Sequence, residues 1–443
     1  MSDLKLNGKN YWKSLDQLAE TPEYKEFLRR EFPQGASEFD NGWSRRKFLT
    51  LMGASMAMAG LAACRRPVEK IVPYVDRPED LLPGIPQDYA TSMPFGDSAF
   101  GLVVESHEGR PQKIEGNKLH PSTGGTSSAM IQAQTLALFD PNRAQFPTNK
   151  GLQKSITEFE SAWKSLYEEF KKNSGEGLAV LSSAFSSPTL SRLAASFKKT
   201  FPRANWVTYE PVSDQNIYDG LQVAYGSLLR PLHSFDKADV ILALDSDFLL
   251  TESDSLINAR RFAKGRKIES ENDKMNRLYV VESGYSVTGA NADHRQAVKS
   301  SKIGFFALAL AWELSSQGVN IIGLNGISGQ ATVGHNFKWV SELAKDLVKN
   351  RGDSLVVAGR KQPASVHALV AAINDGLGNV GKTVRYIRPI DSSASNLQDL
   401  KNLVSYMNDG KISTLIMLGT NPVYNAPADL DFGTALSKIS TSI

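Results

Sequence analysis

Few residues in this sequence could carry redox or metal chemistry. Its 443 residues include one cysteine, Cys64, and six histidines, no two of which lie three or four positions apart. One cysteine excludes an intramolecular disulfide. It also excludes a cysteine-rich zinc site and an iron–sulfur cluster bound by this sequence alone, because such sites take about four thiolates. Any cluster that serves this protein must therefore be held outside these 443 residues.

Two acidic segments could in principle form an active site. Asp245 and Asp247 come directly after the apolar run 240–244 and could form a catalytic pair or bind a metal, but this position is more typical of solvated loop residues. The run 293–295, which reads DHR, fits a structural salt-bridge corner better than a proton shuttle. We therefore assign no catalytic, cofactor-binding or metal-binding residue.

A glycine-rich segment imitates a nucleotide-binding motif. Residues 376–381 read GLGNVG, but they follow a helical pattern and precede a strand pattern. A dinucleotide-binding motif needs the opposite order, a strand and then a helix. The segment is therefore predicted to be a loop.

The strongest functional signal is an export signal at residues 44–64. The run SRRKFL places Arg45 and Arg46 before an apolar stretch, residues 49–63, that is shorter than the roughly 20 residues a membrane-spanning helix needs. Residues 61–64, LAAC, have the form of a lipobox, in which cleavage before Cys64 leaves a thiol that can carry lipid. The alternative is a buried amphipathic helix with a free core cysteine. We predict twin-arginine export through Arg45 and Arg46, lipidation of Cys64, and a location at the periplasmic face of a bacterial inner membrane.

The remaining segments follow from composition and patterning. Residues 1–43 form an extended amphipathic n-region, in which Thr21 and Pro22 mark a helix start, and residues 65–97 form a proline-rich extended connector. Residues 98–443 form an α/β region, which we divide into a small β-containing part at 98–150, a first α/β domain at 151–350 and a second, incomplete α/β unit at 351–443.

The fold class rests on short apolar runs that alternate with helical patterns. The runs are residues 178–181, 240–244, 278–281, 355–358, 384–387 and 414–418. Continuous apolar strands between helices are typical of parallel sheets buried on both faces, so we predict an α/β fold with doubly wound parallel sheets. The formal net charge of +3, from 50 basic and 47 acidic residues, gives no basic face for nucleic acid.

Three segments resemble the molybdopterin oxidoreductase superfamily. Residues 109–121 read GRPQKIEGNKLHP and resemble a conserved hairpin of that superfamily, although a hairpin with a charged edge is the simpler interpretation. Residues 418–424, LGTNPVY, resemble its strand-G-x-N-P loop, and residues 292–294, ADH, fall where it has an A-D segment. The resemblance implies a multi-domain, molybdopterin-oxidoreductase-like fold.

One branch of the superfamily is more similar. The long n-region, the signal, the run CRRPVEKIVPYV at 64–75 and the run NPVYNAPADL at 421–430 resemble the molybdopterin-oxidoreductase-like B subunit of alternative complex III. That resemblance implies a membrane respiratory complex that oxidises quinol. Its implied partners are a multihaem cytochrome c, quinol-binding membrane subunits and a ferredoxin-like part. Haem c and iron–sulfur clusters are expected in those partners or in a missing C-terminal part.

The sequence departs from the catalytic members of the superfamily. It lacks their four N-terminal cysteines and a cysteine to bind molybdenum, and Ser213 or Asp214 would be speculative substitutes. The loop after the run 240–244 reads DSD, whose two carboxylates would repel a pterin pyrophosphate. We therefore expect no cofactor in this chain.

Three functional hypotheses remain. The first is a cofactor-free scaffold portion of alternative complex III, which supports electron transfer from quinol through partner haems and clusters. The second is the N-terminal part of a molybdenum-dependent oxidoreductase of the polysulfide or thiosulfate reductase type. The third is an exported lipoprotein that binds a small molecule at the carboxyl edge of a sheet.

Overall fold

The computed structural model describes residues 21–31, 79, 81–82, 84–95, 98–121, 123–324, 337–389, 392–393 and 395–443. The predicted export residues Arg45, Arg46 and Cys64 lie outside these ranges. The chain divides into two units, Met1–Glu79 and Asp80–Ile443. No helix among the described residues has the length and apolar character needed to cross a bilayer.

The first unit contributes one described helix. Helix α2 (Pro22–Glu31) starts where the sequence predicts. The Oγ1 atom of Thr21 accepts a hydrogen bond from the backbone N–H of Tyr24 at 3.2 Å, which satisfies one of the free donors of the first turn. Pro22 occupies the first helical position, where its missing N–H costs nothing.

The second unit begins with an antiparallel sheet. Strands β1 (Gln87–Phe95), β2 (Ser98–His107) and β3 (Arg110–Gly116) pair in sequence order. The β2–β3 turn passes through Glu108 and Gly109, with φ angles of 51° and 80°, the left-handed region that suits a tight hairpin. Leu102 and Ile114 bury their side chains with those of helix α4 (Ala129–Gln132). The run GRPQKIEGNKLHP therefore builds a hairpin strand and the turn that follows it.

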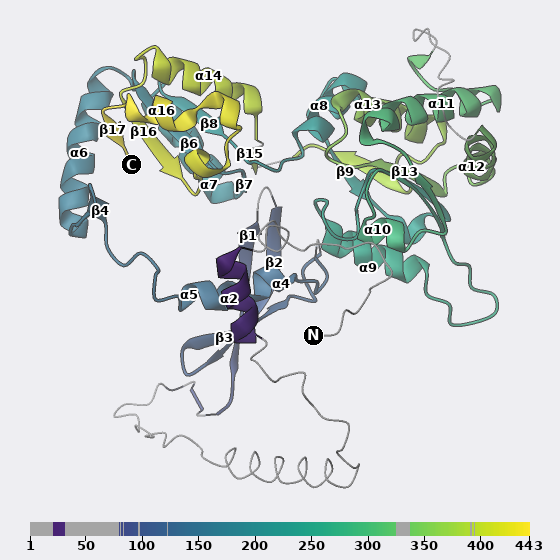
Figure 1. Cartoon of the computed structure of the whole chain (residues 1–443), viewed down its shortest axis with the longest axis horizontal. Coiled ribbons are helices and arrows are strands. Elements are labelled where there is room, and N and C mark those ends of the chain that lie inside the picture. The colour runs from purple at the N-terminus through teal and green to yellow at the C-terminus, as the bar shows by residue number, and fades with distance from the viewer. Residues whose placement is uncertain are drawn as a thin grey trace. The chain divides into compact units, whose positions relative to one another are not determined.

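A four-stranded parallel sheet carries one α/β layer system (Figure 1). Its strands, in spatial order, are β17 (Thr441–Ser442), β16 (Thr414–Leu418), β6 (Leu178–Ser182) and β8 (Asn205–Thr208). Apolar side chains of helices α6 (Ile156–Lys172) and α7 (Pro188–Thr200) pack on one face. Helices α14 (Leu397–Asn408) and α16 (Phe432–Ser437) pack on the other face. The sheet is thus covered on both sides, as continuous apolar strands require.

A second four-stranded parallel sheet has the same layering. Its strands, in spatial order, are β12 (His294–Ala297), β11 (Arg277–Glu282), β10 (Val240–Leu244) and β13 (Ser354–Ala358). Helices α11 (Ile303–Ser316), α12 (Phe337–Lys349) and α13 (Ala364–Gly376) cover one face. Helix α9 (Ser255–Gly265) contributes to the core of the other face.

Two further elements complete this part of the chain. Helix α8 (Gln215–Tyr225) packs against α13. Strands β9 (Arg230–His233) and β14 (Val384–Ile387) form an antiparallel pair, so the apolar run 384–387 is not in a parallel sheet.

The predicted α/β class with doubly wound parallel sheets is confirmed. The strand pairing, however, does not divide at residue 350, where the sequence suggests a domain boundary. β13 lies beyond residue 350 and pairs with β10 before it, while β16 pairs with the early strand β6. The chain forms part of one sheet, builds the second sheet and then returns to complete the first. All these strands have the same apolar character, so their sequences do not reveal which strand each one pairs with.

Candidate functional site

A cavity of about 660 Å³ lies at the carboxyl ends of strands from both parallel sheets. Ala184 follows β6, Glu210 follows β8, residues 249–256 follow β10 and Arg360 follows β13. In doubly wound folds, ligands bind outside the carboxyl ends of strands that connect to opposite sides of the sheet. β10 and β13 are neighbours of this kind, as are β6 and β16. The cavity therefore occupies the ligand crevice of the fold.

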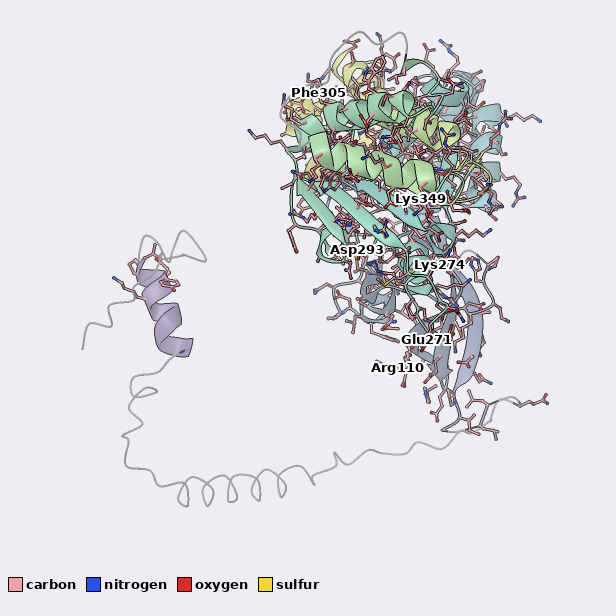
Figure 2. The ribbon with its side chains drawn as sticks, turned by 90° about the vertical axis from the view of Figure 1, so that its right-hand side faces the viewer. Arg110, Glu271, Lys274, Asp293, Phe305 and Lys349 are labelled. Atoms are coloured by element: carbon pink, nitrogen blue, oxygen red, sulfur yellow. The ribbon has the colours of Figure 1, made fainter. Side chains whose placement is uncertain are left out.

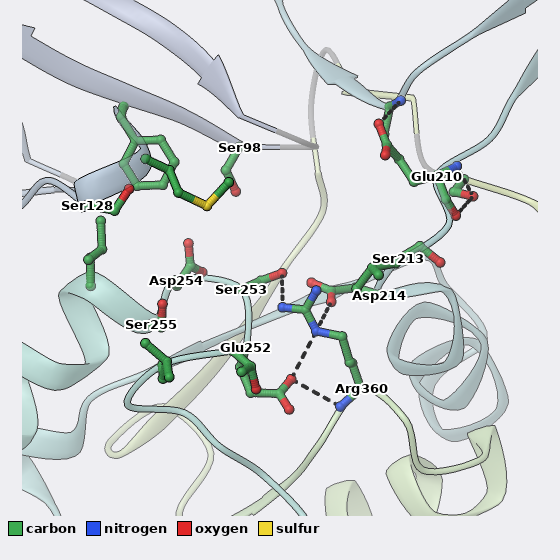
Figure 3. Close-up of a pocket in the computed structure, with 18 of the residues that line it drawn as sticks. Ser98, Ser128, Glu210, Ser213, Asp214, Glu252, Ser253, Asp254, Ser255 and Arg360 are labelled. Carbon is green, nitrogen blue, oxygen red and sulfur yellow. Dashed lines mark hydrogen bonds and ion pairs between the residues drawn. The ribbon is translucent and has the colours of Figure 1, made fainter. Parts of the chain in front are cut away.

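The crevice is lined by acidic and apolar side chains (Figure 3). Its carboxylates are Glu210, Asp214, Glu252 and Asp254, and its one basic lining residue is Arg360. The apolar lining includes Phe100, Met130, Val212, Leu249, Leu250 and Leu256. The walls thus suit an apolar body, and the polar groups give the crevice an excess of negative charge.

Arg360 lies at the centre of the polar groups (Figure 3). Its Nε atom is 3.3 Å from Oε2 of Glu252 and 3.5 Å from Oδ1 of Asp214. Its Nη2 atom donates to Oγ of Ser253 at 3.2 Å. Asp214 is buried and the other two are largely buried, with side-chain exposed fractions of 6% for Asp214, 12% for Glu252 and 15% for Arg360. Two carboxylates therefore share one guanidinium as their counter-ion.

Burial also changes the acidity of this cluster. The pKa of Glu252 is raised, chiefly because burial penalises the carboxylate form, and the charge of Asp214 adds to that shift. The guanidinium and the backbone N–H of Arg360 act in the opposite direction. The net increase shows that Arg360 does not fully compensate for the burial of this carboxylate.

The other two carboxylates also have partners within the chain. Oδ1 of Asp254 lies 2.9 Å from Nη2 of Arg230, which also donates to Oγ of Ser98 at 3.1 Å. Oε1 of Glu210 accepts a hydrogen bond from the backbone N–H of Ala184 at 3.0 Å. These contacts connect the antiparallel sheet, the loop after β6 and the start of α9 around the crevice.

Two helices begin at the crevice, and an aspartate occupies the N-cap position of each, although neither side chain makes a capping hydrogen bond. Asp214 is the N-cap residue of α8, and Asp254 is the N-cap residue of α9, with a φ of 60°. A helix N-terminus ordinarily attracts anions through its free N–H groups and its dipole. In this crevice a fixed carboxylate stands at each of these two helix starts.

The polar residues named in the sequence analysis lie in different parts of the structure. Ser213 and Asp214 line the crevice, whereas Asp245 and Asp247 do not. Oδ2 of Asp245 accepts hydrogen bonds from Ser300 at 2.9 Å and from Gln362 at 2.8 Å. Oδ1 of Asp247 accepts from the N–H and hydroxyl groups of Thr288 at 3.0 and 2.8 Å. The two carboxylates of the DSD loop are partly exposed, and their hydrogen bonds connect the loop to neighbouring elements.

The DHR segment forms a salt-bridge corner, as the sequence predicts. Asp293 receives three hydrogen bonds from the guanidinium of Arg266 at 2.7, 2.7 and 3.0 Å and one from the backbone N–H of Leu278 at 2.7 Å. Nε of Arg295 donates to Glu282 at 2.6 Å. Figure 2 labels Asp293, which directly precedes β12, and Arg110, which is the first residue of β3 in the antiparallel sheet. Neither residue lines the crevice.

The glycine-rich run 376–381 is a loop between α13 and β14, as predicted. Asn379 within it is fully buried and hydrogen-bonds to Ser354 and Asn374, so its role is structural. Among the described residues, no group of three or more histidine, cysteine or acidic side chains is placed to hold a metal ion.

The fold is that of a doubly wound α/β protein with its crevice at the carboxyl ends of the strands, and its similarities lie with molybdopterin-type proteins. The curated relative that it resembles is the menaquinone reductase, molybdopterin-binding-like subunit of Nitratidesulfovibrio vulgaris. The two are 22% identical over 380 residues, which is 77% of this chain and 53% of the relative. The chain thus spans about half the length of that relative.

A solved structure shows the same architecture. Acetylene hydratase from Pelobacter acetylenicus superposes with a TM-score of 0.58 at 11% identity, over 77% of this chain and 58% of that protein. At this identity the likeness concerns the fold alone. No protein-family model matches the chain.

The donor set of the crevice does not suit a pterin dinucleotide. Such a ligand carries an anionic pyrophosphate, which needs free N–H groups or free cationic side chains. Here a carboxylate occupies the N-cap position of each helix without a capping hydrogen bond, and the guanidinium of Arg360 already contacts two carboxylates and a hydroxyl. The residues present would repel the pyrophosphate rather than bind it.

Proposed function

We propose that the chain is a cofactor-free, molybdopterin-oxidoreductase-like scaffold portion of a respiratory quinol oxidoreductase of the alternative complex III type. The observation that carries this proposal is the crevice, which keeps the ligand position of the fold but lines it with four carboxylates. The relative supports the link to quinones, because it is a molybdopterin-binding-like subunit of a menaquinone reductase. In this proposal, haems and iron–sulfur clusters outside the chain carry the electrons.

The proposal includes a location and a set of partners. The twin-arginine signal at Arg45 and Arg46 supports export, and Cys64 supports a lipid anchor at the periplasmic face of the inner membrane. A multihaem cytochrome c, quinol-binding membrane subunits and a ferredoxin-like part would surround the scaffold. With only one cysteine, the chain cannot ligate those clusters by itself.

The experiment is purification of the native protein from membranes in mild detergent. We expect it to elute with subunits that contain covalently bound haem and with quinol-oxidising activity. Haem staining, subunit mass spectrometry and quinol oxidation assays would measure this. A stable monomer without haem partners would contradict the proposal and would favour a lipoprotein that uses the crevice for a small molecule.

A further inference from the structure

We propose that the crevice is a guanidinium-binding site occupied by the chain's own Arg360, and that this internal contact closes the crevice to anionic ligands. The side chain enters from the loop after β13 and is received by residues from two other segments, Asp214 before α8 and the pair Glu252–Ser253 after β10. Three separate segments therefore meet on one planar group.

The backbone of Arg360 is fixed as firmly as its side chain. Its N–H donates to Oε2 of Glu252 at 3.1 Å, and its carbonyl oxygen accepts from Nδ2 of Asn216 at 3.2 Å. The same Glu252 oxygen therefore receives both the backbone N–H and Nε of one residue. An arginine held at its backbone and at its side chain is preorganised to stay in the crevice.

The preceding glycine makes this arrangement possible. A Cβ atom at Gly359 would lie 1.9 Å from the backbone oxygen of Asp245 and 3.0 Å from Oε1 of Glu252. Neither approach is sterically allowed without movement, and the first involves backbone. Only glycine lets the chain after β13 run close enough to the loop after β10 for Arg360 to reach both carboxylates.

The charges explain why an anion would be refused. A phosphate binds best to a free guanidinium, but Nε of Arg360 lies against two carboxylates and its Nη2 donates to the hydroxyl of Ser253. An entering anion would have to displace two buried carboxylates that would then lack their counter-ion. Breaking a buried charge pair in this way is strongly unfavourable. The crevice therefore already holds a cationic group, the guanidinium of Arg360.

Chemical rescue tests the guanidinium site directly. In the full chain, Arg360→Ala removes the side chain and leaves two buried carboxylates, so we expect the thermal midpoint to fall by several degrees. Methylguanidinium at millimolar concentration should restore part of that loss, and methylammonium of equal charge should restore much less. Arg266→Ala, which removes an arginine–aspartate pair outside the crevice, is the matched control and should show no such preference. Equal rescue by both cations, or no rescue in a folded Arg360→Ala variant, would overturn the proposal.

A second measurement keeps the test decisive if Arg360→Ala does not fold. The double variant Asp214→Asn and Glu252→Gln releases Arg360 without removing it. Calorimetry with inorganic pyrophosphate should show affinity at least roughly tenfold above that of the wild-type chain, which corresponds to about 1.4 kcal/mol. Glu210→Gln removes a crevice carboxylate that does not bind Arg360 and should give a smaller gain.

An equal gain in Glu210→Gln and in the double variant would contradict the internal contact, because net charge alone would then explain binding. Tight pyrophosphate binding by the wild-type chain would contradict it as well. Neither measurement involves quinol or partner subunits, so their failure would leave the proposed function under its own test.

Discussion

At the scale of single residues, burial has set the charge states of several groups. His367 is only 6% exposed, and burial lowers its pKa to about 4, against the hydrogen bonds to backbone carbonyls of Gly359 and Gln362 that favour its charged form. Burial lowers the pKa of His233 to about 4 as well, with the positive charges of Arg261 and Arg230 in support. Both side chains are therefore neutral at physiological pH in the folded protein.

The lowered pKa of His367 predicts acid sensitivity. Its pKa is about 4 in the folded chain against 6.5 ordinarily, so the unfolded state binds more protons between these values. Stability is therefore complete above pH 6.5 and is lost as the pH falls toward 4, by about 3 kcal/mol for this one residue. Denaturant unfolding of His367→Gln should show a shallower pH dependence than the wild type. Parallel curves would show that His367 does not contribute.

Glu252 should act in the opposite direction. Because its pKa is raised, the folded state holds a proton that the unfolded state releases, and stability falls as the pH rises from 4.5 through the higher folded value. With rising pH, the free energy of unfolding should therefore fall more in the wild type than in Glu252→Gln. The contacts of Arg360 oppose this shift, because its charge and its hydrogen bonds lower the pKa of Glu252.

The predicted anchor is also a single-residue matter. We expect the mature protein isolated from membranes to begin at Cys64, with the mass of the N-terminal peptide increased by a diacylglyceryl group. Intact-mass and peptide mass spectrometry would measure this. An unmodified Cys64 thiol in a protein that still begins at Met1 would contradict the lipid anchor. Export of a variant that lacks Arg45 and Arg46 would contradict the twin-arginine signal.

Sequence reasoning identified only part of the crevice at this scale. Asp214 entered the sequence analysis only as a speculative substitute for a molybdenum-binding cysteine, and the structure places it in the cavity. Glu252 and Arg360 were missed because they are 108 residues apart, and neither belongs to a motif. The one local signal for Arg360 was the glycine that precedes it at the end of an apolar strand.

At the scale of elements, the contact between α8 and α13 depends on a glycine. A Cβ atom at Gly220 would lie 2.5 Å from Cβ of His367 and 2.6 Å from the carbonyl oxygen of Ala364. The two helices can approach this closely only because Gly220 has no side chain. Since Asp214 occupies the N-cap position of α8, this packing also sets the position of a crevice carboxylate.

Gly220→Ala should therefore destabilise the protein. Overpacking between two buried helices costs about 1–3 kcal/mol, which outweighs the gain of up to about 1 kcal/mol in helix propensity. Gly433→Ala in α16 is the matched control, because its Cβ would meet only Val423, at 3.9 Å. Urea unfolding should show a lower midpoint for the first variant alone. A neutral Gly220→Ala would mean that the helices are farther apart than described.

The strands were easier to predict than their partners. Each apolar run found in the sequence is a strand, because burial on both faces leaves no room for polar alternation. Pairing depends on which helices pack between the strands and on the handedness of the crossovers, and neither is encoded within a strand. The run 384–387 shows the limit, since it reads like the others but pairs antiparallel with β9.

At the scale of the whole molecule, the chain shares the fold of acetylene hydratase and has an acidic crevice. The two parallel sheets converge with their carboxyl ends on one cavity, and the sequence predicted the class of fold. It did not predict that the chain completes its first sheet only after building the second. The residues of the crevice could not be predicted from the sequence, because they come from four strand ends and an antiparallel sheet.

We propose that this crevice does not carry a molybdopterin cofactor. Molybdenum by plasma mass spectrometry and oxidised pterin by fluorescence should be quantified together on the native protein purified from membranes. We expect far less than one molybdenum atom and one pterin per chain, together with haem in the co-purified subunits. Molybdenum and pterin in stoichiometric amounts on this chain would contradict the account and would identify it as part of a molybdenum-dependent oxidoreductase.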